Sequence, residues 1–191
     1  MPCNSASKYL HRVARLDRRG PRPNAVSVIN VEMFTDAQAS DQYRATYSGS
    51  GRSLVEGIPF TAKDSYMMKG LLVTAESPAF QNLTAGFDAF KVVALRAAGG
   101  IPLGKANVPP SMANGGMQRG QHGRDEIPYN ASYLAAAMGS GSSNVCGVST
   151  ASSMAAFGLA EDTVSSRILP ASNNGLVAYT PSGGMLSTRG N

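Results

Sequence analysis

Residues 139–170, GSGSSNVCGVSTASSMAAFGLAEDTVSSRILP, place two clusters of serine at the two ends of one helix-length segment. The first cluster is a Gly/Ser run over 139–143, and the second is the pair Ser165 and Ser166, which precedes Pro170. The small residues of 145–157 favour a helix between the clusters. With a lysine from elsewhere in the chain, the clusters could supply a serine nucleophile and its proton relay. Gly/Ser runs are also common in flexible linkers, and this stretch alone leaves both interpretations open.

An amphipathic helix between two short apolar strands is predicted upstream of this stretch. Residues 58–64 (IPFTAKD) are an apolar run that ends in a charge pair, and residues 101–104 are a second buried strand. Residues 88–98 (DAFKVVALRAA) have helical periodicity, with Phe90, Val93, Ala94 and Ala97 expected to face inward. A strand, a helix and a strand in this order are typical of the α/β class.

The remaining elements are assigned from capping and turn signals. A first helix is expected from Ser5 or Ser7 to Leu16, and a polar surface helix over 35–47 with Thr35 as its N-cap. We expect strands over 25–31 and 176–179, and loops over 109–133 and 181–191.

Lys63 ends the predicted strand over 58–64. An apolar strand that delivers a lysine inward would disfavour its charged form and suit it to act as a base. A lysine on the surface at the end of a strand is the commoner arrangement. The residues around Lys63 do not decide between the two.

The composition indicates a globular chain. Of its 191 residues, 42% are hydrophobic and 15% charged, which excludes intrinsic disorder. No apolar run is long enough for a membrane span, and no secretory signal begins the sequence, so we expect a cytoplasmic protein that binds no membrane. Two cysteines without an export signal do not suggest a disulfide, and His11 and His122 have no metal-ligand spacing.

Six of the seventeen basic residues lie within the first 22 positions, opposed only by Asp17. This end could be a solvated helix face, a nucleic-acid-binding arm or an organellar transit peptide. The solvated face is favoured because no nucleic-acid motif accompanies the charge. We therefore divide the chain into a basic helix and linker over 1–24 and an α/β core over 25–191.

Three collinear segments carry a family resemblance. They are GIPFTAKD at 57–64, the pair VALRAAG at 93–99 with LGKAN at 103–107, and residues 139–170. In this order and spacing they resemble the amidase signature family, and within it fungal-type members similar to the A chain of the amidotransferases. The resemblance implies a mixed β-sheet flanked by helices, and an enzyme that hydrolyses or transfers amide C–N bonds.

The resemblance also implies a Ser–cis-Ser–Lys triad. By position, the lysine base is Lys63, the bridging serine is Ser142 and the nucleophile is Ser166, and the separation of 24 residues between the serines agrees with the family's interval. The bridging serine of the family lies on a cis peptide bond. The backbone N–H groups of four consecutive residues, Thr163, Val164, Ser165 and Ser166, would form the oxyanion hole.

The implied chemistry needs no cofactor and no metal. The expected partners are a small-molecule amide substrate and either a second copy of the chain or an amidotransferase-like partner, with no nucleic acid.

The sequence departs from the family at several positions. Val164 and Ser165 replace two glycines, Asn144 and Val145 replace two more, and Arg167 lies one residue before the family's arginine position. A β-branched residue is a poor substitute wherever a positive φ is required. The chain also ends at Asn191, where the family's domain continues, so the resemblance implies an incomplete domain.

Two functional hypotheses follow from these observations, and a third rests on charge alone. Retention of Lys63, Ser142 and Ser166 favours an amide hydrolase that works through an acyl-enzyme. The lost glycines and the missing half favour a catalytically inactive paralogue with an interaction or vestigial role. The basic N-terminus alone would suggest nucleic-acid binding.

Overall fold

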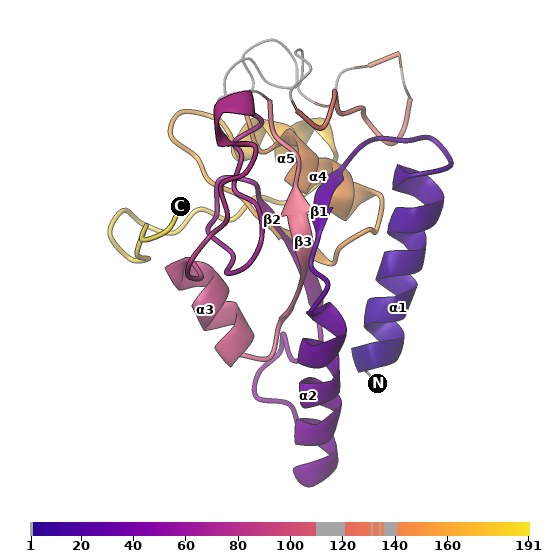
Figure 1. Ribbon diagram of the computed structural model, residues 1–191, viewed down its shortest axis with the longest axis vertical. Helices are drawn as coiled ribbons and strands as arrows, with labels where there is room; N and C mark the ends of the chain where they lie inside the picture. Colours follow the sequence, from indigo (N-terminus) through magenta and orange to yellow (C-terminus); the bar gives the residue numbers. More distant parts are fainter. Residues whose placement is uncertain (1, 110–120, 131, 134, 136–140) are drawn as a thin grey trace.

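A four-stranded mixed sheet lies at the centre of the protein (Figure 1). The computed structural model describes residues 2–109, 121–130, 132–133, 135 and 141–191. The strand order is β1-β3-β2-β4; β2 is parallel to both neighbours, and β1 is antiparallel to β3. The strands are β1 (Val26–Ile29), β2 (Pro59–Lys63), β3 (Ile101–Ala106) and β4 (Phe157–Leu159).

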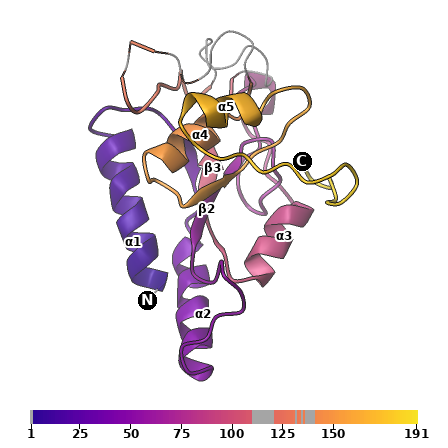
Figure 2. The same ribbon diagram turned by 180° about the vertical axis from the view of Figure 1, so that it is seen from behind.

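Helices cover this sheet on both sides (Figures 1 and 2). Figure 2 shows α4 and α5 in front of the strands, with α1 to one side, α3 to the other and α2 below. The α-helices are α1 (Pro2–Arg12), α2 (Met33–Thr46), α3 (Phe90–Ala97), α4 (Asn144–Ala151) and α5 (Ile168–Asn173); η1 (Val13–Asp17) is a π-helical turn and η2 (Pro78–Phe80) a 3₁₀ turn. Within the described ranges, no helix is long and apolar enough to cross a membrane.

Two hydrophobic clusters form the core, one on each face of the sheet. The first joins α1, α2 and α4 to the sheet and includes Ala106 of β3 and Val145 of α4. The second includes Ala62 of β2 and Val92 of α3. Because successive side chains of a strand alternate between faces, Lys63 lies on the face opposite to Ala62, the face that α4 covers.

The predicted α/β class and mixed sheet are confirmed, and the strands predicted over 25–31, 58–64 and 101–104 are β1, β2 and β3. The helix predicted over 145–157 ends earlier, at Ala151. Ser153 then adopts a positive φ of 54°, which a helix cannot continue through. The chain turns there and enters β4, where Ala156 N donates to Pro59 O at 3.0 Å. The sequence did not predict β4.

Other boundaries also differ from the prediction. The first helix begins at Pro2 without a serine cap, and α2 begins at Met33 with Glu32 rather than Thr35 at the N-cap. Residues 176–179 are irregular instead of forming a strand, and helix α5 precedes them. The described part of 109–133 contains no helix or strand, and residues 110–120 and 131 lie outside the described ranges.

The predicted inward face of α3 is wrong. Val92 is fully buried, whereas Phe90 is 39% exposed and Val93 is 46% exposed. Ala89, just before the helix, is also fully buried and packs in the same cluster as Val92. The core therefore contacts the stripe that contains Ala89 and Val92, one residue away from the stripe that periodicity suggested.

The basic N-terminal helix packs against the rest of the molecule. Ala6 of α1 and Val13 of η1 are buried in the same cluster as β1, β3 and α4. Asp17 accepts hydrogen bonds from the backbone N–H groups of Ala25 and Val26 at the start of β1. The division into segments 1–24 and 25–191 stays a prediction.

Candidate active site

Three predicted site residues come together at the carboxyl end of β2: Lys63, Ser142 and Ser166. In the sequence, 79 residues separate Lys63 from Ser142. Lys63 is the last residue of β2, Ser142 lies two residues before α4, and Ser166 lies two residues before α5. The carboxyl ends of parallel strands are where α/β proteins usually place their ligand sites. Two helix N-termini and one strand end therefore deliver the three side chains to a single place.

A continuous hydrogen-bond chain joins the three side chains. Lys63 Nζ donates to Ser142 Oγ at 2.7 Å, and Ser142 Oγ donates to Ser166 Oγ at 3.0 Å. Lys63 is 1% exposed and Ser142 is 3% exposed, whereas Ser166 is only partly buried. Lys63 is therefore not at the commoner surface position, and the more exposed of the two serines is the one assigned as nucleophile.

Gly141 allows the two serine loops to approach each other. Its φ is +118°, and a Cβ at this position would lie 2.8 Å from Ser166 Cα and 2.9 Å from Pro170 Cδ. Ser143 N also donates to Ser166 O at 3.0 Å, which ties the loops together directly. Glycine is required here for both its backbone conformation and its small size. Gly139 and Ser140 of the same run lie outside the described residues.

Two acidic residues that no sequence motif singled out contact the site. Glu161, just after β4, accepts a hydrogen bond from Lys63 Nζ at 2.7 Å. Asp162 Oδ1 accepts from Ser166 N at 2.9 Å, and its other oxygen lies 3.8 Å from Arg167 Nη2. Their place after an apolar segment was visible in the sequence, but their partners depend on β4 pairing with β2.

The proposed oxyanion-hole donors lie on the turn before Ser166. The N–H of Ser166, which was also predicted to be a donor, donates to Asp162 in this structure, and the oxyanion hole stays a prediction. Among the described residues, the N–H groups of Thr163, Val164 and Ser165 have no hydrogen-bond acceptor. Val164 and Ser165 both have ordinary negative φ angles, so the missing glycines leave no backbone strain at these positions.

The cis peptide bond that the resemblance implied is not present. All peptide bonds in the described residues are trans, including those on either side of Ser142. The Ser142 hydroxyl nevertheless reaches both Lys63 and Ser166, with Gly141 supplying the turn. Asn144 and Val145, at the other replaced glycine positions, are ordinary residues of helix α4.

Cys146 is a packing residue of the core. It is 5% exposed, and burial raises the pKa of its thiol to about 12. A thiol in that state is a poor nucleophile at neutral pH.

His122 pairs with the buried Glu76, whose carboxylate raises the pKa of the imidazole. The described residues contain no group of three His, Cys, Asp or Glu side chains placed to hold a metal.

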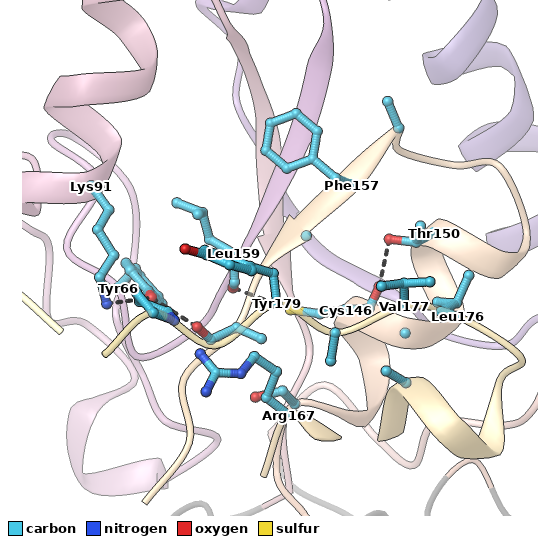
Figure 3. A pocket seen from close by; sticks show the side chains of 18 of the residues that line it. Tyr66, Lys91, Cys146, Thr150, Phe157, Leu159, Arg167, Leu176, Val177 and Tyr179 are labelled. Carbon is cyan, nitrogen blue, oxygen red and sulfur yellow. Dashed lines mark hydrogen bonds between the residues drawn. The ribbon is translucent and has the colours of Figure 1, made fainter. Parts of the chain in front are cut away.

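A cavity of about 470 Å³ adjoins the hydrogen-bond chain, and Figure 3 shows the side chains that line this cavity. Ser143 and Arg167, which directly follow Ser142 and Ser166, line it together with Tyr66 and Lys91. Its remaining lining is mostly apolar and comes from β4, α4 and the segment after α5. Lys63, Ser142 and Ser166 do not line it, so the cavity adjoins the three residues without containing them.

Comparison with known proteins shows the family of the chain. The family model described as Amidase matches residues 5–191. The chain belongs to the amidase family. Its relatives include the A subunits of two glutamyl-tRNA(Gln) amidotransferases, that of Bdellovibrio bacteriovorus, 30% identical over 181 residues, and that of Chromohalobacter salexigens, 31% identical over 188 residues. These alignments cover 95% and 98% of this chain and 36% of each relative.

Solved amidases share the fold. The native peptide amidase of Stenotrophomonas maltophilia superimposes with a TM-score of 0.89 at 31% identity, over 99% of this chain and 38% of that enzyme. The chain therefore spans little more than a third of the length of these proteins that it matches. The three-dimensional likeness confirms the mixed sheet flanked by helices that the resemblance implied.

Proposed function

We propose that this amidase-family chain hydrolyses a carboxamide C–N bond through an acyl-enzyme on Ser166. The observation that carries the proposal is the unbroken chain of contacts from Ser166 Oγ through Ser142 Oγ to Lys63 Nζ. A serine hydroxyl needs a base to become a useful nucleophile, and among the described residues the route from Ser166 to a base passes through a second hydroxyl.

The first half of the reaction forms the acyl-enzyme. Ser166 Oγ bonds to the carbonyl carbon while its proton passes to Ser142 Oγ, and the proton of Ser142 passes to neutral Lys63. Collapse of the tetrahedral intermediate breaks the C–N bond, and the leaving nitrogen takes a proton back along the same path. Thr163, Val164 and Ser165 supply N–H groups for the oxyanion, each donor being worth on the order of 10²–10³ in rate in comparable sites.

The second half regenerates the enzyme. Water attacks the acyl carbon, gives its proton to the relay, and releases a carboxylic acid as Ser166 regains its proton. No step requires an oxidant, a reductant or a bound metal. The substrate class that fits is a small carboxamide. A homodimer, an amidotransferase-like partner and a cytoplasmic location stay predictions.

Labelling with a fluorophosphonate tests the proposal, because this reagent reacts with activated serines. We expect one adduct per chain, mapped to Ser166 by peptide mass spectrometry, and its loss in Ser166→Ala. Ser172→Ala is the matched control, since Ser172 is an exposed serine of α5 outside the hydrogen-bond chain. A cooperatively melting wild-type protein that takes no label would overturn the proposal and favour the inactive-paralogue hypothesis, which the comparisons do not support.

A further inference from the structure

The amine of Lys63 is held from two sides. Ser142 Oγ and Glu161 Oε1 each lie 2.7 Å from Nζ. Lys63 extends from the end of β2 and Glu161 follows β4, its parallel neighbour, so strand pairing fixes the spacing of the two side chains. The lysine side chain is 1% exposed and the glutamate side chain 21% exposed. This is a mostly buried ion pair at the base of the relay rather than a surface pair.

Lys63 Nζ is the donor at the start of the hydrogen-bond chain. Nζ donates to Ser142, and Ser142 in turn donates to Ser166. Activation of Ser166 needs the opposite direction, with Ser166 donating to Ser142 and Ser142 donating to a neutral amine. A carboxylate beside the amine favours its charged form. Glu161 therefore stabilises the resting arrangement, not the reactive one.

We propose that Glu161 is a positioning residue that holds Lys63 against Ser142 and, through its negative charge, sets the pH above which the relay can accept a proton. The inference rests on the proposed function, because it assigns a regulator to the same relay. In its neutral form Lys63 still has two N–H bonds, so it can donate one to Glu161 while its lone pair accepts the proton of Ser142. Glu161 thus keeps the amine aligned in both protonation states.

Other charged and titratable groups also face this pair. Lys91 of α3 and Arg167 lie near Glu161, and burial, the largest influence, lowers the pKa of Lys91 while Glu161 raises it. The phenol of Tyr66 lies near Glu161 and Arg167, and the thiol of Cys146 in α4 near Lys63 and Glu161; burial raises the pKa of each. Neither is ionised at neutral pH, so the Glu161 carboxylate is the anion that directly contacts Lys63.

The test separates the charge of Glu161 from its hydrogen bond. Glu161→Gln keeps an acceptor oxygen and removes the charge, whereas Glu161→Ala removes both. Glu32→Gln is the matched control, an exposed glutamate at the N-cap of α2. The rate of fluorophosphonate labelling at Ser166 is measured against pH for all four proteins.

We expect the pH of half-maximal labelling to fall by about one unit or more in Glu161→Gln, with a plateau rate close to that of wild type. Glu161→Ala should show a similar fall together with a plateau about tenfold lower, because the amine loses its alignment. Glu32→Gln should match wild type. An unchanged midpoint in Glu161→Gln would overturn the inference, since a merely structural glutamate would alter the plateau alone.

A second readout does not depend on the proposed function. The ¹³Cε signal of Lys63, assigned by its loss in Lys63→Met, is titrated in wild type and in Glu161→Gln. A lower titration midpoint in Glu161→Gln supports the inference even if Ser166 takes no label, in which case only the proposed function fails. Equal midpoints in the two proteins overturn the inference whatever the labelling result.

Discussion

Two buried lysines on neighbouring strands differ in what surrounds their amines. Lys63 of β2 contacts two side chains that can exchange protons, Ser142 and the partly exposed Glu161. Lys105 of β3 is fully buried and donates to the backbone carbonyls of Asp64, Tyr66 and Leu72 at 2.9, 2.6 and 3.2 Å. The first amine begins a relay of hydroxyl groups, whereas the second donates to backbone carbonyls, with the buried carboxylate of Asp64 3.5 Å away.

One extra residue in β3 places the two lysines on opposite faces of the sheet. The pairing of β2 with β3 shifts between Phe60 and Thr61, so that Leu103 is passed over and Lys63 pairs with Ala106. Without this shift Lys63 would pair with Lys105, and both amines would lie on one face of the sheet. Burial is therefore common to both lysines. The face of the sheet and the partners on that face distinguish them.

The largest effect on stability is expected from Lys105→Met. Removing the amine leaves three carbonyls, those of the buried Asp64 and Tyr66 and that of Leu72, without this donor, and the buried carboxylate of Asp64 without its ion-pair partner. This should cost about 3–5 kcal/mol of the free energy of unfolding. Urea denaturation followed by circular dichroism measures this cost, with the exposed Lys8→Met as control. A loss below about 1 kcal/mol would show that Lys105 does not hold these loops together.

Gly141→Ala should affect both the stability and the relay. The new Cβ would crowd Ser166 Cα and Pro170 at a φ of +118°, so we expect a cost of about 2 kcal/mol or more and slower labelling of Ser166. Gly70→Ala is the control, because Gly70 also has a positive φ of 82° but no atom lies within 4 Å of the place that its Cβ would take. Equal effects of the two substitutions on labelling would show that the close approach of the two loops is unimportant.

A smaller effect is expected from pH. Burial lowers the pKa of Lys105 to about 8, and Asp64 opposes this only in part. Because the unfolded chain holds this proton up to about pH 10, it binds more protons than the folded protein from about pH 8 upward. The contribution of Lys105 to the free energy of unfolding therefore rises with pH across that window.

The difference in unfolding free energy between wild type and Lys105→Met should accordingly widen by on the order of 1 kcal/mol between about pH 7.5 and about pH 9.5. Urea titrations at the two pH values measure it. A difference that narrows as pH rises would mean that the amine is more easily protonated in the folded protein than in the unfolded one.

The sequence predicted the parts of this comparison that depend on local patterns. The apolar runs before Lys63 and Lys105 predicted β2 and β3, and resemblance to a family located Ser142 and Ser166. The position of Lys63 and Lys105 on opposite faces of the sheet could not be predicted, because it follows from the shift in pairing at Phe60 and Thr61.

The role of Glu161 was also outside the reach of local patterns. It depends on β4, a strand of three residues that begins after an unexpected positive φ at Ser153. A serine at that position gives no signal for a turn of this kind, whereas a glycine would have. Contacts made by long-range pairing were thus missed, while elements set by their own residues were found.

The most direct test of the account is the labelling rate of Lys63→Met beside that of wild type, with melting curves for both. We expect Lys63→Met to melt cooperatively, because Ser142 and the partly exposed Glu161 lose only one shared partner, and to lose labelling of Ser166 by about a hundredfold or more. Labelling of Ser166 at the wild-type rate in Lys63→Met would contradict the assignment of Lys63 as the base.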